Sequence, residues 1–463
     1  MSNLYAIVLA AGKGTRMKSN LYKVLHPVCG KPMVQHIVDR LHLLAAKQIV
    51  VVVGHGAEQV KEQLGMTVQY AHQEQQLGTA HAVMASGELL KDKAGTTIVI
   101  SGDTPLVRTE TLKNLIEHHE QSQAAATVVT TVLEDPTGYG RIIRNADGFV
   151  ERVVEHKDAT IGQRQVREIN TGIYCFDNQK LFQALAQVKN DNVQGEYYLP
   201  DVLQILREQS DLISAYVTDN PKEGIGVNDR VQLSAAEKYL RQRINEQHMK
   251  NGVTIIDPDS TYIEADVVIE ADTVIHPGTH LKGNTKIGAG CVIGPNAELI
   301  DCQVESHVHI RYSVAAGSVI RQAATVGPFS YIRPGSDVGE EAKVGNFVEL
   351  KNTKLGKKSK VPHLSYVGDS EVGRFVNIGC GAITVNYDGI NKHKTIIGDE
   401  SFIGCNANLV APVTIGDGAY IAAGSTITDD VASEALAIAR ARQINKAYYA
   451  KKMLKSNKTE IGK

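Results

Sequence analysis

The sequence has little net charge, no closely paired cysteines and no long apolar run. Its 463 residues carry a formal net charge of −2, so no strong basic field indicates a nucleic-acid partner. No apolar stretch reaches the roughly 18 residues that a transmembrane helix needs, so we expect no membrane partner. The Lys-rich segment from Lys446 to Lys463 is more typical of a solvated helix face with a frayed end than of a binding arm.

Six scattered cysteines, none in a C-x-x-C pair, predict neither a zinc site nor a disulfide framework. Free thiols suit a reducing cytoplasm. The first strand-like run, Ala6 to Leu9, follows no basic region and begins no signal-length apolar stretch, so we expect a cytoplasmic protein. The cysteines are Cys29, Cys175, Cys291, Cys302, Cys380 and Cys405.

The chain is too long for one ordinary core, and its first part alternates strand-like and helix-like segments. Several of the strands are apolar on successive residues, as expected when helices cover both faces of a sheet. We therefore predict a Rossmann-like α/β domain with a mostly parallel sheet. The predicted strands are Tyr5–Ala10, Gln48–Val53, Thr96–Ser101 and Ala124–Thr131, and the predicted helices are Met33–Ala46, Ala80–Lys91 and Glu110–Gln121.

The second part has a period of six residues. A helical stripe ends at about Lys250, and aliphatic residues then recur every six positions, with Gly, Asp, Asn and Ala between them. A helix cannot keep such a stripe on one face, whereas a hexapeptide β-helix points one aliphatic residue per repeat inward. The periodic positions are Ile269, Ile275, Leu281, Ile287, Ile293, Leu299, Val326, Ile332, Val338, Val344, Leu350, Ile397, Ile403, Leu409, Ile415, Ile421 and Ile427.

These patterns divide the chain into an N-terminal domain over residues 1–229, a linker helix over 230–250 and a β-helix domain over 251–463. Gln443 to Leu454 has a helical pattern and is expected to cap the coil, because an open coil end exposes unpaired strands. Two segments, Val361–Asp369 and Asn386–His393, break the period, and such loops often carry function.

A glycine-containing loop follows the first strand. In Leu9-Ala10-Ala11-Gly12-Lys13-Gly14-Thr15-Arg16-Met17, free backbone N–H groups suit a phosphate, and Arg16 and Lys23 add positive charge. Alone, the loop is weak evidence for a phosphate site, because an ordinary strand-to-helix turn also contains such glycines. Asp103 follows another predicted strand, where α/β sheets bind ligands, although a lone Asp is more often a turn or capping residue.

Together, this loop and Lys23-Val24-Leu25 closely resemble the signature of sugar-nucleotide pyrophosphorylases. With the hexapeptide part, essentially the whole chain resembles the bacterial bifunctional N-acetylglucosamine-1-phosphate uridyltransferase/glucosamine-1-phosphate acetyltransferases. One departure is Tyr22, where many members have proline. The resemblance implies a left-handed β-helix and a homotrimer. It also implies acetylation of glucosamine 1-phosphate by acetyl-CoA, followed by Mg²⁺-dependent transfer from UTP to N-acetylglucosamine 1-phosphate. The product would be UDP-N-acetylglucosamine, a cell-wall precursor.

The same resemblance implies a role for particular residues of the first domain. UTP would be bound by Leu9, Ala10, Ala11, Gly12, Arg16, Lys23, Gln73, Gly78 and Thr79, and the sugar phosphate by Gly140, Glu155, Asn170 and Asn228. Asp103 and Asn228 would be the Mg²⁺ ligands. Oxygen ligands suit this hard cation, and phosphoryl-type transfer depends chiefly on positioning and charge neutralisation.

For the β-helix, the resemblance implies that His363 is the general base. Histidine is the usual base near neutral pH, and His363 lies where the period breaks, but a lone histidine is more often a surface residue. Arg333, Lys351, Tyr366 and Asn377 would bind the sugar phosphate, and acetyl-CoA would contact Cys380, Asn386, Tyr387, Cys405, Ala423 and Arg440. No base is visible beside Cys405, so we interpret it as a pocket wall.

Two alternatives stay open from the sequence. The β-helix is only structural or regulatory in the first, which leaves Arg333, Lys351, His363 and Tyr366 unexplained. In the second, the protein is a non-enzymatic scaffold, and the glycine loop, Lys23 and Asp103 are coincidental.

Overall fold

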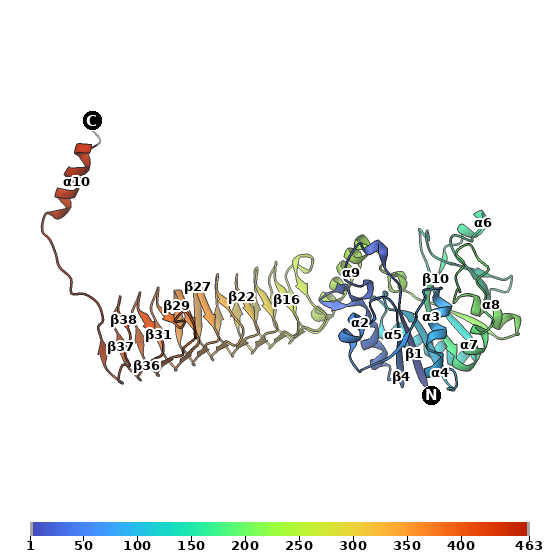
Figure 1. The fold of residues 1–463 in the computed structure, drawn as a ribbon, viewed down its shortest axis with the longest axis horizontal. Coiled ribbons are helices and arrows are strands. Elements are labelled where there is room, and N and C mark those ends of the chain that lie inside the picture. Colours follow the sequence, from blue (N-terminus) through green and yellow to red (C-terminus); the bar gives the residue numbers. More distant parts are fainter. Residues whose placement is uncertain (1–2, 461–463) are drawn as a thin grey trace. The chain divides into compact units, whose positions relative to one another are not determined.

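The computed structural model describes residues 3–460, the last six of them by their backbone alone. The chain forms two compact units, Met1–Arg243 and Ile244–Lys463, which are described separately below. Figure 1 shows the N-terminal unit as helices around a sheet and the C-terminal unit as a stack of short strands.

The N-terminal unit is built on a mostly parallel sheet with β1 (Leu4–Ala10) near its centre. β1 pairs in parallel with β4 (Gln48–Val53) and β6 (Thr96–Ser101). The sequence predicted these strands correctly, and β7 (Ala126–Val132) within two residues. Along the main strand order of this sheet, the exception to parallel pairing is β10 (Glu168–Asp177), which is antiparallel to β6 and β7. The remaining strands of this sheet are β5 (Gln69–His72), β8 (Arg141–Arg144), β9 (Val150–Val154) and β11 (Ile213–Val217).

Helices cover both faces of this sheet because successive side chains of β1 point to opposite sides. Ala6 and Val8 pack with α1 (Met33–Leu43), α2 (Ala57–Leu64) and α5 (Thr109–Ser122). Tyr5 and Ile7 lie in the other apolar layer. That layer is formed with α3 (Thr79–Ala85), α4 (Gly87–Leu90), α7 (Asn178–Leu185) and α8 (Asp201–Glu208). The apolar run of β1 therefore forms part of two cores.

Two predicted helices have different bounds in the structure. The helix predicted over Met33–Ala46 ends at Leu43, and Ala45 has a left-handed φ of 54° that a right-handed helix cannot contain. The helix predicted over Ala80–Lys91 is divided at Ser86, whose hydroxyl donates to the Val83 carbonyl.

The shorter elements are η1 (Thr15–Met17), η2 (Lys23–Leu25), β2 (Pro27–Val28), β3 (Lys31–Pro32), α6 (Ile161–Arg164), η3 (Pro221–Gly224) and η4 (Pro258–Ser260).

The long helix α9 spans Arg230–Lys250, and its residues belong partly to each unit. In the N-terminal unit, Glu237 accepts a hydrogen bond of 2.6 Å from the Cys29 N–H. In the C-terminal unit, the Asn245 side chain is fully buried and donates to the carbonyls of Pro258 and Thr261 at 2.9 and 3.1 Å. These bonds attach the two parts of the helix to their own units.

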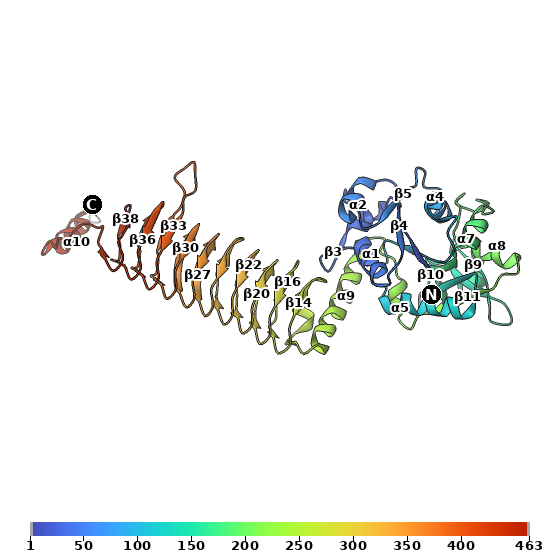
Figure 2. The ribbon, with the colours of Figure 1, turned by 90° about the horizontal axis from the view of Figure 1, so that it is seen from below.

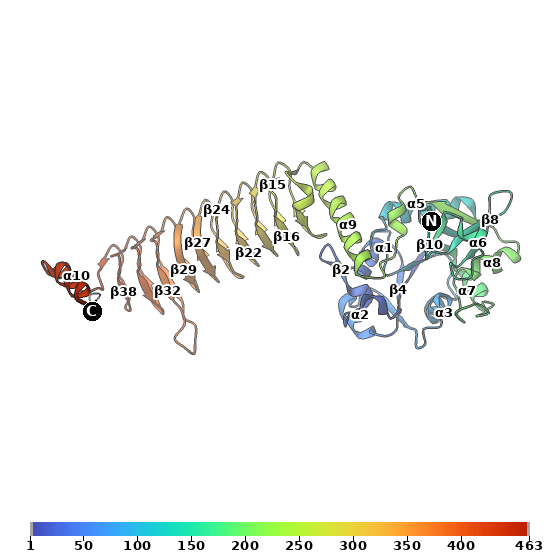
Figure 3. The same cartoon turned by 90° about the horizontal axis from the view of Figure 1, so that it is seen from above.

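The C-terminal unit is a parallel β-helix whose coils repeat about every 18 residues (Figures 2 and 3). Val274 pairs with Val292 and Leu281 with Leu299, so equivalent positions stack in columns. All seventeen aliphatic residues at the predicted six-residue spacing are buried, with exposed fractions of 6% or less. The predicted inward stripe is thus confirmed.

Three faces make up each coil, and each face has its own set of stacked strands. The first face contains β12 (Thr254–Ile255), β15 (Val274–Ile275), β18 (Val292–Ile293), β21 (His309–Ile310), β24 (Thr325–Val326), β31 (Asn377–Ile378), β34 (Phe402–Ile403), β37 (Tyr420–Ile421) and β39 (Leu436–Ala437). The second contains β13 (Tyr262–Ile263), β16 (His280–Lys282), β19 (Glu298–Ile300), β22 (Val314–Ala316), β25 (Tyr331–Ile332), β32 (Ile383–Val385), β35 (Asn408–Val410) and β38 (Thr426–Ile427). The third contains β14 (Val268–Ile269), β17 (Lys286–Ile287), β20 (Gln303–Val304), β23 (Val319–Ile320), β26 (Asp337–Val338), β28 (Lys354–Leu355), β30 (Ser370–Val372), β33 (Thr395–Ile397) and β36 (Val413–Ile415).

Two longer strands, β27 (Lys343–Lys351) and β29 (Lys360–Gly368), continue around the corner from the first face to the second. They pair with each other along most of their length, and Asn346 lies opposite His363. Close stacking at this corner requires glycine: a Cβ on Gly345 would lie 1.8 Å from the Pro362 carbonyl oxygen. The next insertion, between β32 and β33, projects from the stack (Figure 2).

The predicted C-terminal capping helix is wrong in its bounds and in its packing. α10 spans Tyr449–Glu460, because Tyr448 has a left-handed φ of 60° and interrupts the helix predicted from Gln443. Tyr449, Met453 and Leu454 are at least half exposed, so these side chains do not cover the coil end. Among the residues described here, no helix is both long enough and apolar enough to span a membrane.

A core substitution tests the column arrangement. Leu281 is fully buried and pairs with Ile263 and Leu299, so Leu281→Ala should destabilise the β-helix by about 3 kcal/mol through lost burial and a cavity. Hydrogen-exchange mass spectrometry of β13, β16 and β19 should show the loss of protection. Lys286→Ala, at an exposed position of the next face, is the control and should change protection little. Equal effects of both variants would contradict the assignment.

Candidate active sites

The loop after β1 lies against the segment Tyr22–Lys23. Gly14 has a left-handed φ of 61°, and a Cβ there would lie 2.4 Å from the Lys23 Cβ. Glycine is therefore required for both the backbone conformation and the close approach. The loop leaves the sheet at the carboxyl end of β1, beside the carboxyl end of β6, which Asp103 follows.

Three distant segments meet at the Lys23 ammonium group. Lys23 Nζ forms an ion pair with Asp103 Oδ2 and donates to Asn228 Oδ1 at 2.7 Å. Arg16 donates to the same Asn228 oxygen at 2.9 Å. The side chains of Lys23 and Asp103 are only 12% and 14% exposed, so water screens this pair less than a surface pair. The two predicted Mg²⁺ ligands, Asp103 and Asn228, therefore lie together with the side chains predicted to bind phosphate, Arg16 and Lys23.

The oxygens of Asp103 and Asn228 fit a hard divalent cation. Both already point at one positive group, Lys23, and Mg²⁺ commonly takes one or two protein oxygens and completes its shell with phosphate and water. Within the described residues, no group of three or more His, Cys, Asp or Glu side chains is arranged to hold a metal ion. A cation here would therefore depend on its substrate for further ligands.

A pocket of about 260 Å³ opens beside this cluster. Its lining brings together seven residues that the sequence analysis selected: Leu9, Thr79, Asp103, Gly140, Glu155, Asn170 and Asn228. It also contains Tyr139 and Tyr174, which sequence reasoning missed. Tyr174 accepts a 2.7 Å hydrogen bond from the Asn170 side chain, and no motif indicated it, because β10 was not predicted.

The predicted sugar-binding residues converge through backbone pairing. The Asn170 N–H donates to the Gly140 carbonyl at 2.9 Å, and a Cβ on Gly140 would lie 3.1 Å from Glu155 Oε1. Glycine therefore leaves room for the carboxylate. A register shift in β10 between Asn170 and Tyr174 departs from regular pairing at this point, as bulges near sites often do.

The predicted uracil-contacting residues form a second cluster, and of these only Thr79 lines the pocket described above. Gln73 is 3% exposed, and its Nε2 lies 3.1 Å from both the Gly78 carbonyl and His81 Nδ1. Because both contacts involve Nε2, its Oε1 is left as the acceptor for a ligand. Thr79 Oγ1 accepts from the Leu199 N–H at 2.9 Å. Ala10, Ala11, Gly12, Arg16, Lys23, Gln73 and Gly78 do not line that pocket.

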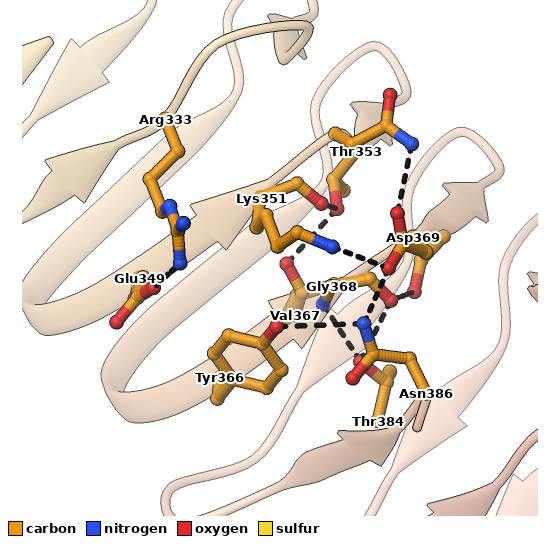
Figure 4. A network of polar contacts seen from close by, with 12 residues as sticks. Arg333, Glu349, Lys351, Thr353, Tyr366, Val367, Gly368, Asp369, Thr384 and Asn386 are labelled. Carbon is orange, nitrogen blue, oxygen red and sulfur yellow. Dashed lines mark hydrogen bonds and ion pairs between the residues drawn. The ribbon is translucent and has the colours of Figure 1, made fainter. Parts of the chain in front are cut away.

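On the β-helix, four polar side chains form a connected network on the second face (Figure 4). Lys351 Nζ lies 2.6 Å from Asp369 Oδ2, which also accepts from the Asn386 side chain. Asn386 is 7% exposed and additionally donates to the Tyr366 hydroxyl at 3.4 Å. Arg333 forms a 2.9 Å ion pair with Glu349, which stacks directly beside Tyr366 in register.

These ion pairs hold the pKa values of their members away from the usual range. The Asp369 hydrogen bond raises the pKa of Lys351, and the Glu349 hydrogen bond raises the pKa of Arg333. Burial pushes the pKa of Asp369 upward, but the hydrogen bonds from Asn352, Lys351 and Asn386 outweigh it and the net shift is downward. Both cations therefore stay charged, and a phosphate that binds here would share each of them with a carboxylate. Sequence reasoning found the cations but missed their partners Glu349 and Asp369, which lie sixteen and eighteen residues further on.

His363 lies at the corner between the first two faces and is exposed. Its Nδ1 is 2.9 Å from Asn346 Oδ1. Because a side-chain carbonyl oxygen only accepts, this contact places the proton on Nδ1 and leaves Nε2 unprotonated in the neutral ring. Asn346, missed in the sequence analysis, is the residue opposite His363 on β27. The arrangement suits a general base.

The predicted acetyl-CoA residues follow the same corner. The Leu364 and Cys380 carbonyls accept from the N–H groups of Gly381 and Asn406, and the Cys405 carbonyl accepts from Gly424. Cys380, Cys405 and Ala423 therefore occupy equivalent positions of successive coils, in line with His363. Arg440 and Tyr387 are exposed, Tyr387 in the projecting insertion. Asn377 begins β31 on the first face and makes no hydrogen bond to the second-face network in the described structure.

Comparisons with known proteins match both units. Residues 5–221 match the nucleotidyl transferase family, and residues 266–301 and 394–429 match the bacterial transferase hexapeptide family of six repeats. With the parallel stacked strands, the second match identifies a left-handed β-helix.

Curated relatives match along the entire chain. A protein from Brevibacillus brevis named "Bifunctional protein GlmU" is 62% identical over 460 residues, which cover 99% of this chain and 100% of the relative. Proteins of the same name from Geobacillus thermodenitrificans and Listeria monocytogenes are 58% and 54% identical. These matches cover 98% and 97% of this chain and 99% of each relative.

Glu155, one of the predicted sugar-binding residues, also lines a second pocket, together with Asp158 and Asp201. Burial raises the pKa of Asp201 to about 6, and the Asp158 charge adds to the shift. Burial likewise raises the pKa of Glu155, with contributions from Asp158 and Asp201. In weakly acidic solution, Glu155 and Asp201 are therefore protonated to a greater extent in the folded protein than in the unfolded chain.

This arrangement predicts a pH-dependent stability. The pKa of Asp201 is higher in the folded protein than in the unfolded chain. Its contribution to the free energy of unfolding is therefore fully present below about pH 4 and is lost as the pH rises to about 6. With a discount for partial exposure, Asp201→Asn should raise the unfolding free energy by about 1 kcal/mol at about pH 7.5 and leave it unchanged near pH 4. Urea unfolding at both pH values measures this. Exposed Asp191→Asn, on the same pocket, is the control; a pH-independent gain in Asp201→Asn would refute the explanation.

Proposed function

The chain belongs to the family of bifunctional GlmU proteins, and from this premise we propose how its two units share the synthesis of UDP-N-acetylglucosamine. The β-helix transfers an acetyl group from acetyl-CoA to glucosamine 1-phosphate. The N-terminal unit then transfers a uridylyl group from UTP to N-acetylglucosamine 1-phosphate and releases pyrophosphate. We assign residues 1–229 and 251–463 to these two activities and 230–250 to the helix between them.

The main support for this proposal is the sequence similarity to bifunctional relatives over both units. A β-helix that is only structural is disfavoured, because Arg333, Lys351, Tyr366 and His363 share the outer surface of neighbouring coils. A non-enzymatic scaffold is disfavoured as well, because the chain belongs to a family of enzymes. The free cysteines support a reducing cytoplasm as the location.

In uridylyl transfer, an oxygen of the sugar phosphate attacks the α-phosphorus of UTP. The bond from that phosphorus to the bridging oxygen breaks, and its electron pair leaves with pyrophosphate. Arg16 and Lys23 neutralise the phosphates, while the N–H groups of the Leu9–Gly12 loop orient them. Asp103 and Asn228 would hold Mg²⁺, which supplies further charge neutralisation at the phosphates. Gly140, Glu155 and Asn170 hold the sugar, and Gln73, Gly78 and Thr79 hold the uracil.

In acetyl transfer, Nε2 of His363 takes the proton of the 2-amino group while the nitrogen attacks the acetyl carbonyl carbon of acetyl-CoA. The carbon–sulfur bond breaks, its electron pair leaves with the sulfur of CoA, and the proton held on Nε2 of His363 passes to this thiolate. The bond to Asn346 holds the imidazole in the tautomer that this step needs. Arg333 and Lys351 bind the phosphate, and Tyr366 and Asn377 hold the sugar. The residues that bind CoA are Cys380, Asn386, Tyr387, Cys405, Ala423 and Arg440.

We assign a homotrimer in which the β-helices of neighbouring subunits together complete each acetylation site. Two observations support this assembly. His363, Arg440 and Tyr387 are exposed in the single chain, although acyl transfer benefits from a site that excludes water. In addition, Tyr312, Phe329 and Phe347 form an exposed ladder along the corner that continues to Leu364, the residue after His363, with Phe329 and Phe347 stacked at 5.5 Å.

Two substitutions should separate the two activities. Asp103→Ala should lower uridylyl transfer by about 100-fold or more, since it removes a proposed Mg²⁺ ligand, and should stop the pathway at N-acetylglucosamine 1-phosphate. His363→Ala should lower acetylation by about 100-fold or more and still uridylylate supplied N-acetylglucosamine 1-phosphate. Mass spectrometry of products from glucosamine 1-phosphate, acetyl-CoA, UTP and Mg²⁺ measures both. A wild type that never acetylates the amine would show that the β-helix is a scaffold.

A mixing experiment tests the shared site. If His363 of one chain serves CoA bound by Arg440 of another, trimers that contain both His363→Ala and Arg440→Ala subunits should recover about a third of their acetylation sites. Acetylation of the mixture, co-expressed and purified through two tags, measures the recovery. Mixed Lys23→Ala and Asp103→Ala subunits are the control and should not recover uridylyl transfer, because that cluster lies within one unit. Absence of recovery in the first mixture would rule out the shared site.

A further inference from the structure

Tyr22 is a buried residue at the base of the glycine loop. It directly precedes Lys23, at the N-terminus of the short helix η2, and is 6% exposed. It is also the position at which the sequence departs from the proline common in the resembling family. The mechanism above assigns Tyr22 no role, yet its contacts reach both sides of the proposed nucleotide site.

The hydroxyl of Tyr22 donates to the Ala10 carbonyl at 2.7 Å, and the bond is buried. Burial raises the pKa of this phenol well above its usual range, so the hydroxyl keeps its proton and remains a donor. Ala10 is the last residue of β1, and its carbonyl shares a planar peptide group with the Ala11 N–H. Fixing the direction of this carbonyl therefore fixes the Ala11 N–H, which points to the opposite side.

The ring of Tyr22 holds a second segment. A Cβ on Gly56 would lie 2.9 Å from Tyr22 Cδ2, so the ring packs directly against the turn that precedes α2. On the other side, Lys23 packs against Gly14 and forms the ion pair with Asp103. Tyr22 and Lys23 together thus contact the beginning and the middle of the loop.

We propose that Tyr22 is a positioning residue for nucleotide binding: its hydroxyl anchors the first peptide of the loop so that the following N–H groups face the phosphates of UTP. The inference rests on the uridylyl transfer proposed above and adds to it a determinant of UTP affinity. In this chain, a tyrosine hydrogen bond supplies the rigidity that the ring of proline supplies at the same position by a fixed φ. The effect should fall on UTP rather than on the sugar phosphate, because Tyr22 does not line the pocket that Gly140, Glu155 and Asn170 line.

The test is Tyr22→Phe in the full-length protein, which removes the hydroxyl and keeps the ring. We expect kcat/KM for UTP to fall about tenfold, mainly through KM, because a buried carbonyl loses its partner. KM for N-acetylglucosamine 1-phosphate and the acetylation rate should stay within about twofold of wild type. Titration calorimetry with UTP, without the second substrate, should show a similar loss of affinity.

Tyr70→Phe is a matched control, since it removes a hydroxyl that also donates to a backbone carbonyl, that of Gly65, at 2.7 Å. It should leave both UTP constants unchanged. The inference is overturned if Tyr22→Phe retains the wild-type KM for UTP. It is also overturned if both KM values, kcat and Tm change together, as a general loss of structure would produce. A wild type without uridylyl transfer would instead reject the proposed function.

Discussion

In-register parallel pairing of strands is the constraint on which both sites depend. In the N-terminal unit, pairing of β1 with β4 and β6 aligns their carboxyl ends, so the glycine loop and Asp103 emerge at the same edge. In the β-helix, pairing of each coil with the next turns positions about eighteen residues apart into columns, and Tyr331, Glu349 and Tyr366 become neighbours. A slip of one residue would turn the inward aliphatic positions outward and separate the functional side chains.

Charge compensation is the second theme of both sites. Before any ligand binds, Lys23 is paired with Asp103, Lys351 with Asp369 and Arg333 with Glu349. A phosphate that enters must therefore share these cations with resident carboxylates, which keeps them ordered but reduces the net gain from each new contact. We therefore expect these carboxylates to lower the affinity of each cation for a phosphate.

The sequence predicted what depends on local periodicity. All seventeen inward aliphatic residues follow from the six-residue spacing, and the strands β1, β4 and β6 follow from short continuous apolar runs, as expected for strands covered on both faces. The strand β10 was not predicted, because its run of buried residues is interrupted near the register shift at Asn170, and its antiparallel direction depends on the whole sheet. Glu155 and Asn170 rested on resemblance, and the Lys23–Asn228 contact joins residues 205 positions apart, which no local pattern encodes. The bounds of α10 were wrong, since the left-handed conformation of Tyr448 has no clear sequence signal.

The coil repeat has a consequence for how such a chain can change in evolution. A duplication or deletion of one complete coil preserves every column beyond it and changes only the length of the stack. A shorter insertion cannot be absorbed into the columns and must loop out, as the segment between β32 and β33 does. Length variation should therefore occur either in whole coils or in projecting loops. Loops of the second kind, anchored at both ends by a rigid coil, provide places where new ligand contacts can arise without loss of the fold.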